Sequence, residues 1–265
     1  MKEYIKLKKE VEKIVRSAAR FARNVDFTVS EKGDVANVVT TADVNVQHYL
    51  CEKLKKLLPQ AGFYCEEEDL RDTESEFIWV IDPIDGTMNY TRGIPECAIS
   101  VGLIRNKEPV VGVVHNPFHK DTFSAALGDG ATKNGKPIHV SSSTFDRSLF
   151  FTAMSLYKKD LAPICSEIIS EAYARCSDVR RYGTCALELC YLAEGKADLF
   201  FEMRVFPWDY AGAYLVLKEA GGVLRGFDGE VLTFDKATPL IGANNVENYE
   251  ELNRIVLRHM EKVPY

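Results

Sequence analysis

The sequence lacks the features that mark membrane, secreted and disulfide-rich proteins. It has no run near the ~20 apolar residues that a membrane-spanning helix needs, and its first residues are charged and amphipathic, unlike a signal peptide. Its seven cysteines are odd in number and form no CxxC pair, so we expect reduced, partly buried thiols. Together these absences predict a soluble, cytoplasmic protein with no membrane partner.

The sequence also lacks an excess of basic residues. It has 33 Lys and Arg against 39 Asp and Glu, a net charge of -6, which argues against a nucleic-acid partner because such partners require a basic patch. An acidic chain that handles phosphates needs cations to mediate. The five histidines show no metal-ligand spacing, so we expect them to be structural or exposed.

The apolar pattern predicts alternating helices and strands in a chain of 265 residues, long enough for one large domain or two intimate subdomains. A helix capped by Thr41 or Asp43 ends at Pro59, and residues 31–34 read as a polar loop. The remaining expected helices lie at 3–24, 159–174, 184–194, 209–220 and 247–262, and the strands at 77–81, 97–104, 110–115, 122–127, 198–202 and 240–241.

The order of these elements predicts stacked layers of helices and sheets. The strands between 97 and 127 are separated by turn residues and read as an antiparallel meander, and Asp228-Gly229 marks a later hairpin. The polar patch at 141–144 is the expected boundary between subdomains of about 1–145 and 146–265, within a single domain spanning 1–265.

The strongest chemical signal is the segment Trp79-Val80-Ile81-Asp82-Pro83-Ile84-Asp85-Gly86-Thr87. An apolar strand ends there in two aspartates three residues apart, and strand ends are where open α/β sheets place their sites. Two carboxylates suit Mg²⁺, and Gly86 lets the backbone approach a phosphate closely. A strand followed by an ordinary Asp-Gly turn explains the same residues, so the segment alone leaves both interpretations open.

Three further segments bear on chemistry, and each has an ordinary structural explanation. The acids from Glu66 to Asp69 could be a solvated charge run. Asp209 could cap a helix, and Gly183-Thr184 could open another helix by capping or by holding an anion. The joint occurrence of all three segments in this order is what makes them informative.

The motifs run in one order from Lys32 and Thr40-Thr41-Ala42-Asp43 through Glu66-Glu67, DPIDGTMN and Gly183-Thr184 to WDYAGA and EAGG. On these residues the chain resembles the inositol monophosphatase family of Mg²⁺-dependent, lithium-sensitive sugar and polyol phosphatases. The resemblance implies an α/β fold, an αβαβα sandwich of the sugar phosphatase type. It also implies a homodimer, a site in the cleft between the subdomains, and a small phosphorylated polyol or sugar as substrate.

The resemblance further implies two to three Mg²⁺ ions. Glu66, Asp82 and the backbone carbonyl of Ile84 would hold the first ion. Asp82, Asp85 and Asp209 would hold the second, with Asp82 bridging the two.

Outer positions would support these ligands. Glu67 would orient a water or a metal from outside the set of direct ligands, and Lys32 lies in the loop that precedes the site. A third, weaker ion would lie near Glu66. Asn37 stands where many members have Asp, which puts the surroundings of that third ion in doubt.

The resemblance assigns catalysis to Asp43, Glu66 and Thr87. Asp43 and Thr87 would form a hydrogen-bonded pair that positions and helps to deprotonate the attacking water, while the amides of Gly86 and Thr87 would receive the phosphate. A metal-activated water would attack phosphorus directly, so no Cys, Ser or His nucleophile is required.

Substrate hydroxyls would meet Asp85, Glu202 and the Gly183-Thr184-Cys185 segment. A carboxylate such as Glu202 can accept hydrogen bonds from two neighbouring hydroxyls, although an exposed residue at a strand end is its ordinary explanation. Cys185 stands where Ala is common, and we hypothesise that it makes activity sensitive to thiol oxidants.

The sequence therefore predicts a Mg²⁺-dependent phosphomonoester hydrolase with inositol monophosphate as the expected substrate. Fructose 1,6-bisphosphatase, histidinol phosphatase and 3',5'-bisphosphate nucleotidase activities are alternatives on the same scaffold, and Arg180 or Arg181 could reach a second phosphate or form a surface ion pair. A regulatory binding protein that retains the fold is the alternative outside enzymes. The intact acids favour the enzyme, because clustered carboxylates repel one another without a metal.

Overall fold

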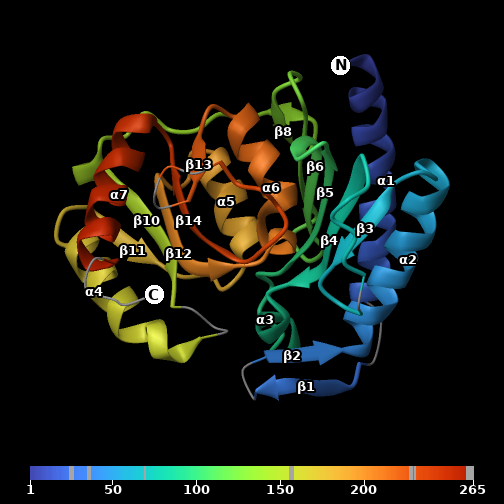
Figure 1. Ribbon diagram of the computed structural model, residues 1–265, viewed down its shortest axis with the longest axis horizontal. Helices are drawn as coiled ribbons and strands as arrows, with labels where there is room; N and C mark the ends of the chain where they lie inside the picture. Colours follow the sequence, from blue (N-terminus) through green and yellow to red (C-terminus); the bar gives the residue numbers. More distant parts are fainter. Residues whose placement is uncertain are drawn as a thin grey trace.

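The layers of the molecule follow the order helix, sheet, helix, sheet, helix (Figure 1). The computed structural model describes residues 1–23, 27–34, 37–68, 70–154, 158–226, 229 and 231–260, with the backbone alone for 31–34, 37 and 38. The observed order of layers confirms the αβαβα sandwich that the resemblance implies.

The first sheet has seven strands and carries the predicted meander. Its strands β3 and β4 pair in parallel, and each later neighbour pairs antiparallel. In spatial order the strands are β3 (Gly62–Cys65), β4 (Phe77–Asp85), β5 (Ala98–Arg105), β6 (Glu108–Asn116), β7 (Asp121–Ala126), β8 (Ala131–Lys133) and β9 (Lys136–Pro137). The helices α1 (Lys2–Arg23) and α2 (Thr41–Leu57) cover its outer face with the apolar stripes seen in the sequence.

The second sheet has five strands and belongs to the later part of the chain. In spatial order they are β11 (Asp178–Arg180), β10 (Leu149–Ala153), β12 (Leu199–Val205), β14 (Thr238–Ala243) and β13 (Val223–Arg225). The outer face is covered by α4 (Ala162–Tyr173) and α7 (Val246–Met260), with short 3₁₀ turns at Phe145–Arg147 and Lys159–Leu161. The sequence predicted β12 and β14 but missed β10, β11 and β13.

The middle layer consists of α5 (Cys185–Ala193) and α6 (Pro207–Glu219), which lie between the two sheets (Figure 1). Glycines let α6 approach the first sheet closely. A Cβ on Gly112 would lie 2.2 Å from the carbonyl oxygen of Gly212, and one on Gly102 would lie 3.0 Å from the Cβ of Ala211. The WDYAGA motif therefore has a packing role, because it seats the helix that carries Asp209 on the sheet that carries Asp82.

The prediction of a polar loop at residues 31–34 is wrong. Strand β1 (Val29–Asp34) pairs antiparallel with β2 (Asn37–Thr40), and this hairpin lies beside the short helix α3 (Thr87–Thr91) (Figure 1). A mostly polar strand gives no apolar alternation, so its pairing partner could not be read from the sequence.

Helix α2 begins at Thr41, so neither of the two expected caps is its N-cap. Thr40 is its N-cap, and Asp43 is the third helical residue, which accepts a hydrogen bond from the Thr40 backbone at 2.8 Å in a capping box. Residues 141–144, expected as a boundary, lie between β9 and the first 3₁₀ turn, and the division into subdomains stays a prediction. The hairpin expected at Asp228 lies outside the described residues.

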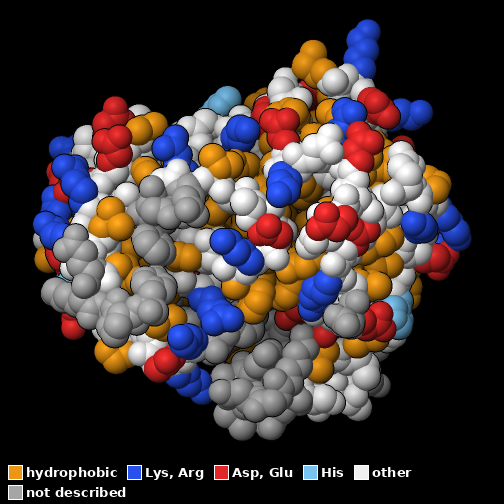
Figure 2. Space-filling model, in the orientation of Figure 1, with side chains coloured by type: hydrophobic (Ala, Val, Ile, Leu, Met, Phe, Trp, Pro, Cys, Tyr) orange, Lys and Arg blue, Asp and Glu red, His pale blue; other side chains and the backbone are white. Residues whose placement is uncertain are grey.

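Within the described residues, no helix is long and apolar enough to span a lipid bilayer. The seven cysteines all carry free thiols. Charged side chains of both signs are interspersed over the face drawn in Figure 2.

Candidate active site

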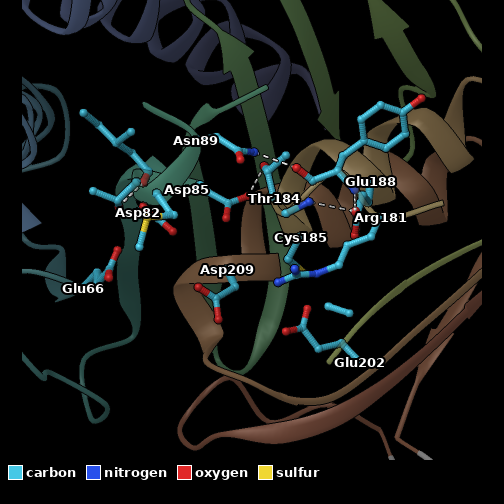
Figure 3. A pocket seen from close by; sticks show the side chains of 17 residues that line it. Glu66, Asp82, Asp85, Asn89, Arg181, Thr184, Cys185, Glu188, Glu202 and Asp209 are labelled. Carbon is cyan, nitrogen blue, oxygen red and sulfur yellow. Dashed lines mark hydrogen bonds between the residues drawn. The ribbon is translucent and has the colours of Figure 1, made fainter. Parts of the chain in front are cut away.

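A cavity of about 340 Å³ opens where the end of β4 faces α5, α6 and β12 (Figure 3). Side chains from both sheets and from the middle layer meet in it. Its lining consists of Glu66, Asp82, Ile84, Asp85, Gly86, Thr87, Met88, Asn89, Ala153, Arg181, Tyr182, Gly183, Thr184, Cys185, Glu188, Glu202 and Asp209. Every residue predicted to hold metal or to meet substrate is in this set.

An irregularity in β4 brings Asp82 and Asp85 to the same cavity. Residues three apart in a regular strand point to opposite faces of a sheet. Here Asp82 pairs with Ser100 and Asp85 with Ala98, and the register shifts between the two pairs. Pro83 lies in this break, where a strand can tolerate a residue without a backbone N–H. Asp82 and Asp85 are 1% and 8% exposed as residues, so burial is nearly complete for both.

Glu66 reaches the cavity because β3 runs parallel to β4. Cys65 is paired with Ile81, and the Glu66 amide donates to the Ile81 carbonyl at 3.1 Å, so Glu66 lies beside Asp82. The side chain of Gln47 fixes the next residue. Its amide donates to the Glu67 carbonyl at 2.6 Å and its oxygen accepts from the Glu67 N–H at 3.0 Å. Glu67 is buried but does not line the cavity.

Asp82 is buried among three other acids of the cavity. Burial is the main cause that raises the pKa of Asp82 well above its ordinary value, and the charges of Glu66, Asp85 and Asp209 raise it further. Its Oδ1 is buried, and no group in the described part of the chain donates a hydrogen bond to it. A buried carboxylate among like charges needs a compensating cation or a proton.

Asp209 enters from the opposite wall of the cavity, in the first turn of α6. Its Oδ2 accepts from the Phe206 N–H at 2.7 Å, and Pro207 opens the helix at a position where no N–H is needed. Figure 3 shows its carboxyl facing the side of the cavity that carries Glu66 and Asp82. Asp209 therefore takes part in capping the helix, as its ordinary structural explanation holds, and it also lines the cavity.

The predicted pair of Thr87 and Asp43 is present as a long contact. The Thr87 hydroxyl lies 3.3 Å from Asp43 Oδ1 and 2.9 Å from the Ile84 carbonyl oxygen, so two acceptors compete for one proton. Asp43 is fully buried behind the cavity, and its other oxygen belongs to the α2 capping box. Gly86, before α3, has φ 85°, a left-handed conformation that glycine adopts without strain.

Thr184 joins α5 to the end of β4. It is the N-cap of α5, and its hydroxyl donates to Asp85 Oδ2, which also accepts from the Ala186 N–H at 2.7 Å. Burial raises the pKa of Asp85 to about 7, although these two hydrogen bonds oppose the rise. Asp85 is therefore oriented by the helix N-terminus on one side and remains on the cavity wall.

The remaining predicted substrate residues line the far wall. Glu202, on β12, is 8% exposed, and burial followed by the charge of Asp209 raises its pKa well above the ordinary value. Figure 3 shows the Arg181 guanidinium between Asp209 and Glu202. Arg180 instead forms an exposed ion pair with Asp178 at 2.5 Å, so of the two arginines considered only Arg181 lines the cavity. The side chain of Lys32 lies outside the described residues.

Sequence reasoning missed Glu188. It lies on α5, accepts from the N–H groups of Tyr182 at 2.5 Å and Gly183 at 3.2 Å, and lines the cavity with 1% of its surface exposed. Burial raises its pKa to about 8. Asn89 also binds this segment, because its side-chain amide donates to the Tyr182 carbonyl at 2.6 Å. The sequence did hold a signal for Glu188, because an acidic residue follows Gly183-Thr184 by about one helical turn.

The donor set fits hard divalent cations, which prefer carboxylate oxygens. Among the residues that the structure describes, no three His, Cys, Asp or Glu side chains are already arranged around one point as metal ligands. The unpartnered Asp82 Oδ1 and the like charges around it show that the cluster is electrostatically incomplete with protein atoms alone. Glu66, Asp82, Asp85 and Asp209 are therefore the residues that could hold such ions.

A sequence model of the inositol monophosphatase family matches residues 1–261. The chain belongs to this family. It is 34% identical over 229 residues to the inositol-1-monophosphatase of Synechocystis, covering 85% of this chain and 79% of that protein. It is also 34% identical over 202 residues to the Nus factor SuhB of Escherichia coli, covering 76% of this chain and 75% of that protein.

Solved structures agree with this family assignment. The structure of the Thermotoga maritima IMPase superposes with a TM-score of 0.85 at 28% identity, covering 96% of this chain and 97% of that one. Inositol monophosphatases are phosphoric monoester hydrolases, and this member of the family is an enzyme of that class.

Proposed function

We propose that this enzyme is a Mg²⁺-dependent phosphatase of small phosphorylated polyols, with inositol monophosphate as its preferred substrate. The observation that carries the proposal is the meeting of Glu66, Asp82, Asp85 and Asp209 in one buried cavity, with an unpartnered oxygen on Asp82. Relatives named as inositol monophosphatases support the choice of substrate.

In this proposal the acids divide into two overlapping ligand sets. Glu66, Asp82 and the Ile84 carbonyl would hold one Mg²⁺, and Asp82, Asp85 and Asp209 would hold another. Such ions would supply a bound water with a pKa lowered toward ~7 and positive charge for the leaving oxygen. Without that charge the acids would repel one another, as the raised pKa of Asp82 indicates.

The protein's own groups position the reactants. The amides of Gly86 and Thr87, at the turn into α3, bind the phosphate, because exposed N–H groups at such a turn favour anions. The Thr87 hydroxyl orients the attacking water, with Asp43 at 3.3 Å available to accept a proton through it.

The far wall of the cavity suits a polyol. Glu202, Thr184 and Cys185 line it, and Glu202 supplies a carboxylate that can accept hydrogen bonds from neighbouring hydroxyls. Arg181 lies beside Glu202 (Figure 3), and its positive charge opposes the rise in the pKa of that carboxyl that burial and the charge of Asp209 cause. A third ion near Glu66 and a homodimer remain predictions.

A regulatory role is the second candidate. A relative 34% identical to this chain is named a Nus factor, which suggests assembly with the transcription machinery for that protein. The complete set of acids favours catalysis here, because a purely binding role gains nothing from burying mutually repelling carboxylates.

Phosphate release from a panel of esters tests the proposal. The panel contains inositol 1-phosphate, fructose 1,6-bisphosphate, histidinol phosphate and a nucleotide 3',5'-bisphosphate, each with Mg²⁺, with a chelator, and with Mg²⁺ plus Li⁺. We expect the fastest release from inositol 1-phosphate, abolished by chelation and suppressed by Li⁺. A higher kcat/KM for another ester would overturn the substrate, and equal rates under chelation would overturn the metal dependence.

A further inference from the structure

The guanidinium of Arg71 organises the loop that carries Glu66. Its Nη1 donates to the backbone carbonyls of Cys65, Glu68 and Leu70, the last two at 3.3 and 3.1 Å, and its Nη2 donates to the Glu66 carbonyl at 3.3 Å. Four carbonyls of one short loop thus point at one cation. Arginine suits this arrangement because its planar group carries five N–H donors in a fixed geometry.

The same guanidinium also lies over aromatic rings that belong to other elements. Its Cζ lies 4.7 Å from the ring centroid of Trp208 and 5.4 Å from that of Tyr64. Trp208 directly precedes Asp209 in α6 and is stacked on Phe206 with a centroid distance of 4.7 Å and an interplanar angle of 5°. A cation over the face of Trp is attracted by the ring quadrupole.

Arg71 therefore connects two elements that supply different acids to the cavity. The other backbone ties of the Glu66 loop, to Ile81 and to Gln47, hold it to the first sheet and to α2. The contact between Arg71 and Trp208 holds it to α6 instead. These two elements carry Glu66 and Asp209, and because like charges repel, a cationic tie between the elements opposes their separation.

We propose that Arg71 is a positioning residue that sets the spacing between Glu66 and Asp209 and thereby sets the affinity of the cavity for divalent cations. Arg71 does not line the cavity, so it acts through the loop backbone and the Trp208 ring. The inference rests on the proposed function, in which these acids hold Mg²⁺. A merely structural tie would stabilise the fold without changing cation affinity.

Direct binding of Mg²⁺ to the metal-free, full-length protein tests this role by isothermal titration calorimetry without substrate. We expect Arg71→Ala to weaken binding by about 10-fold or more, since removing an outer partner of metal ligands costs ~10- to 100-fold in affinity. Arg71→Lys keeps the charge but loses the planar fork, and we expect an intermediate loss. Added Mg²⁺ should restore most of kcat in both variants.

Arg105→Ala is the matched control. Arg105 is also exposed, lies 5.2 Å over the Phe77 ring and bonds Glu76 at 2.9 Å, but it does not line the cavity. Its removal should leave Mg²⁺ affinity unchanged. Thermal unfolding of each variant without metal separates loss of fold from loss of affinity, and Arg71→Lys decides the test if Arg71→Ala does not fold.

Two outcomes overturn different statements. Parental Mg²⁺ affinity in the folded Arg71 variants, even with a lower melting temperature, would overturn the positioning role while leaving the proposed function intact. A parent protein that binds no Mg²⁺ would overturn the proposed function, and the positioning role with it.

Discussion

The hydroxyl of Thr184 donates a hydrogen bond to Oδ2 of Asp85 across 99 positions of the chain. One partner ends a strand of the first sheet and the other caps a helix of the middle layer. The same contact thus satisfies a helix N-terminus and orients an acid of the cavity. It also shows that the geometry of the cavity depends on the packing of the layers and not on the DPIDGT segment alone.

Replacing Thr184 by Val should damage both functions of this contact. The variant loses the cap and one donor to Asp85, so we expect the free energy of unfolding to fall by about 1–2 kcal/mol. Phosphatase activity should fall by roughly 10-fold, since Asp85 loses an outer partner. Thr184→Ser keeps the hydroxyl and should stay near the parent in urea unfolding and in phosphate release. Equal losses in the two variants would contradict this account.

Asp209→Asn should separate activity from folding. The amide oxygen can still accept from the Phe206 N–H, but the variant loses one negative charge from the crowded cavity. We expect a melting temperature equal to or above that of the parent without metal, and activity lower by at least about 100-fold. Asp198→Asn, a buried acid outside the cavity that accepts from the Leu149 N–H at 2.7 Å, should show the opposite pattern.

Glu202→Gln should change the ranking of substrates. The amide accepts fewer hydrogen bonds than a carboxylate, so we expect kcat/KM for inositol 1-phosphate to fall by about 10-fold or more. The rate on p-nitrophenyl phosphate, which lacks the polyol, should change much less. Parallel kinetics on the two esters measure the difference, and an unchanged ratio would remove Glu202 from the polyol site.

His115 should make the fold sensitive to acid. Burial lowers its pKa to about 4 from an ordinary 6.5, and the nearby Arg16 contributes. Arg16 donates to the Thr122 hydroxyl at 3.1 Å, which leaves that hydroxyl free to donate to His115 Nδ1 at 2.9 Å and favours the neutral ring.

The pKa of His115 is lower in the folded protein than in the unfolded one. Its contribution to the free energy of unfolding is therefore fully present above pH 6.5 and is lost as the pH falls toward 4. The loss should reach roughly 3 kcal/mol. Urea unfolding between pH 7.5 and 4.5 should show a shallower decline for His115→Gln, which does not titrate. Identical pH dependence in the two proteins would rule out this contribution.

The structure argues against the hypothesis that Cys185 makes activity sensitive to oxidants. Its thiol is 6% exposed, and burial raises its pKa well above the ordinary value, whereas the reactive form of cysteine is the accessible thiolate. Cys51 is half-buried and its Sγ lies 3.9 Å from that of Cys65, next to Glu66.

We therefore expect Cys185→Ala to lose activity to peroxide as fast as the parent and Cys51→Ser to lose it more slowly. The loss should be reversed by dithiothreitol. Protection by Cys185→Ala alone would restore the original hypothesis. Phosphate release after timed exposure measures all three proteins.

The sequence by itself determined the elements with strong local patterns. The apolar stripe of α1, the meander around β5 to β7 and the helix predicted at 209–220 follow from side-chain periodicity and turn residues, which act over a few positions. The ordered motifs also indicated the family and the acids Glu66, Asp82, Asp85 and Asp209, all of which line one cavity. Their roles as ligands stay predictions.

Only the tertiary structure decided how these residues meet. The break in β4 turns Asp82 and Asp85 to one side, and the layers bring Thr184 and Arg71 to partners far along the chain. The strand β1 escaped prediction for the same reason, because its backbone pairs with β2 and its mostly polar sequence does not indicate that partner. Contacts between distant segments depend on packing and burial, and a single sequence does not encode these in any local pattern.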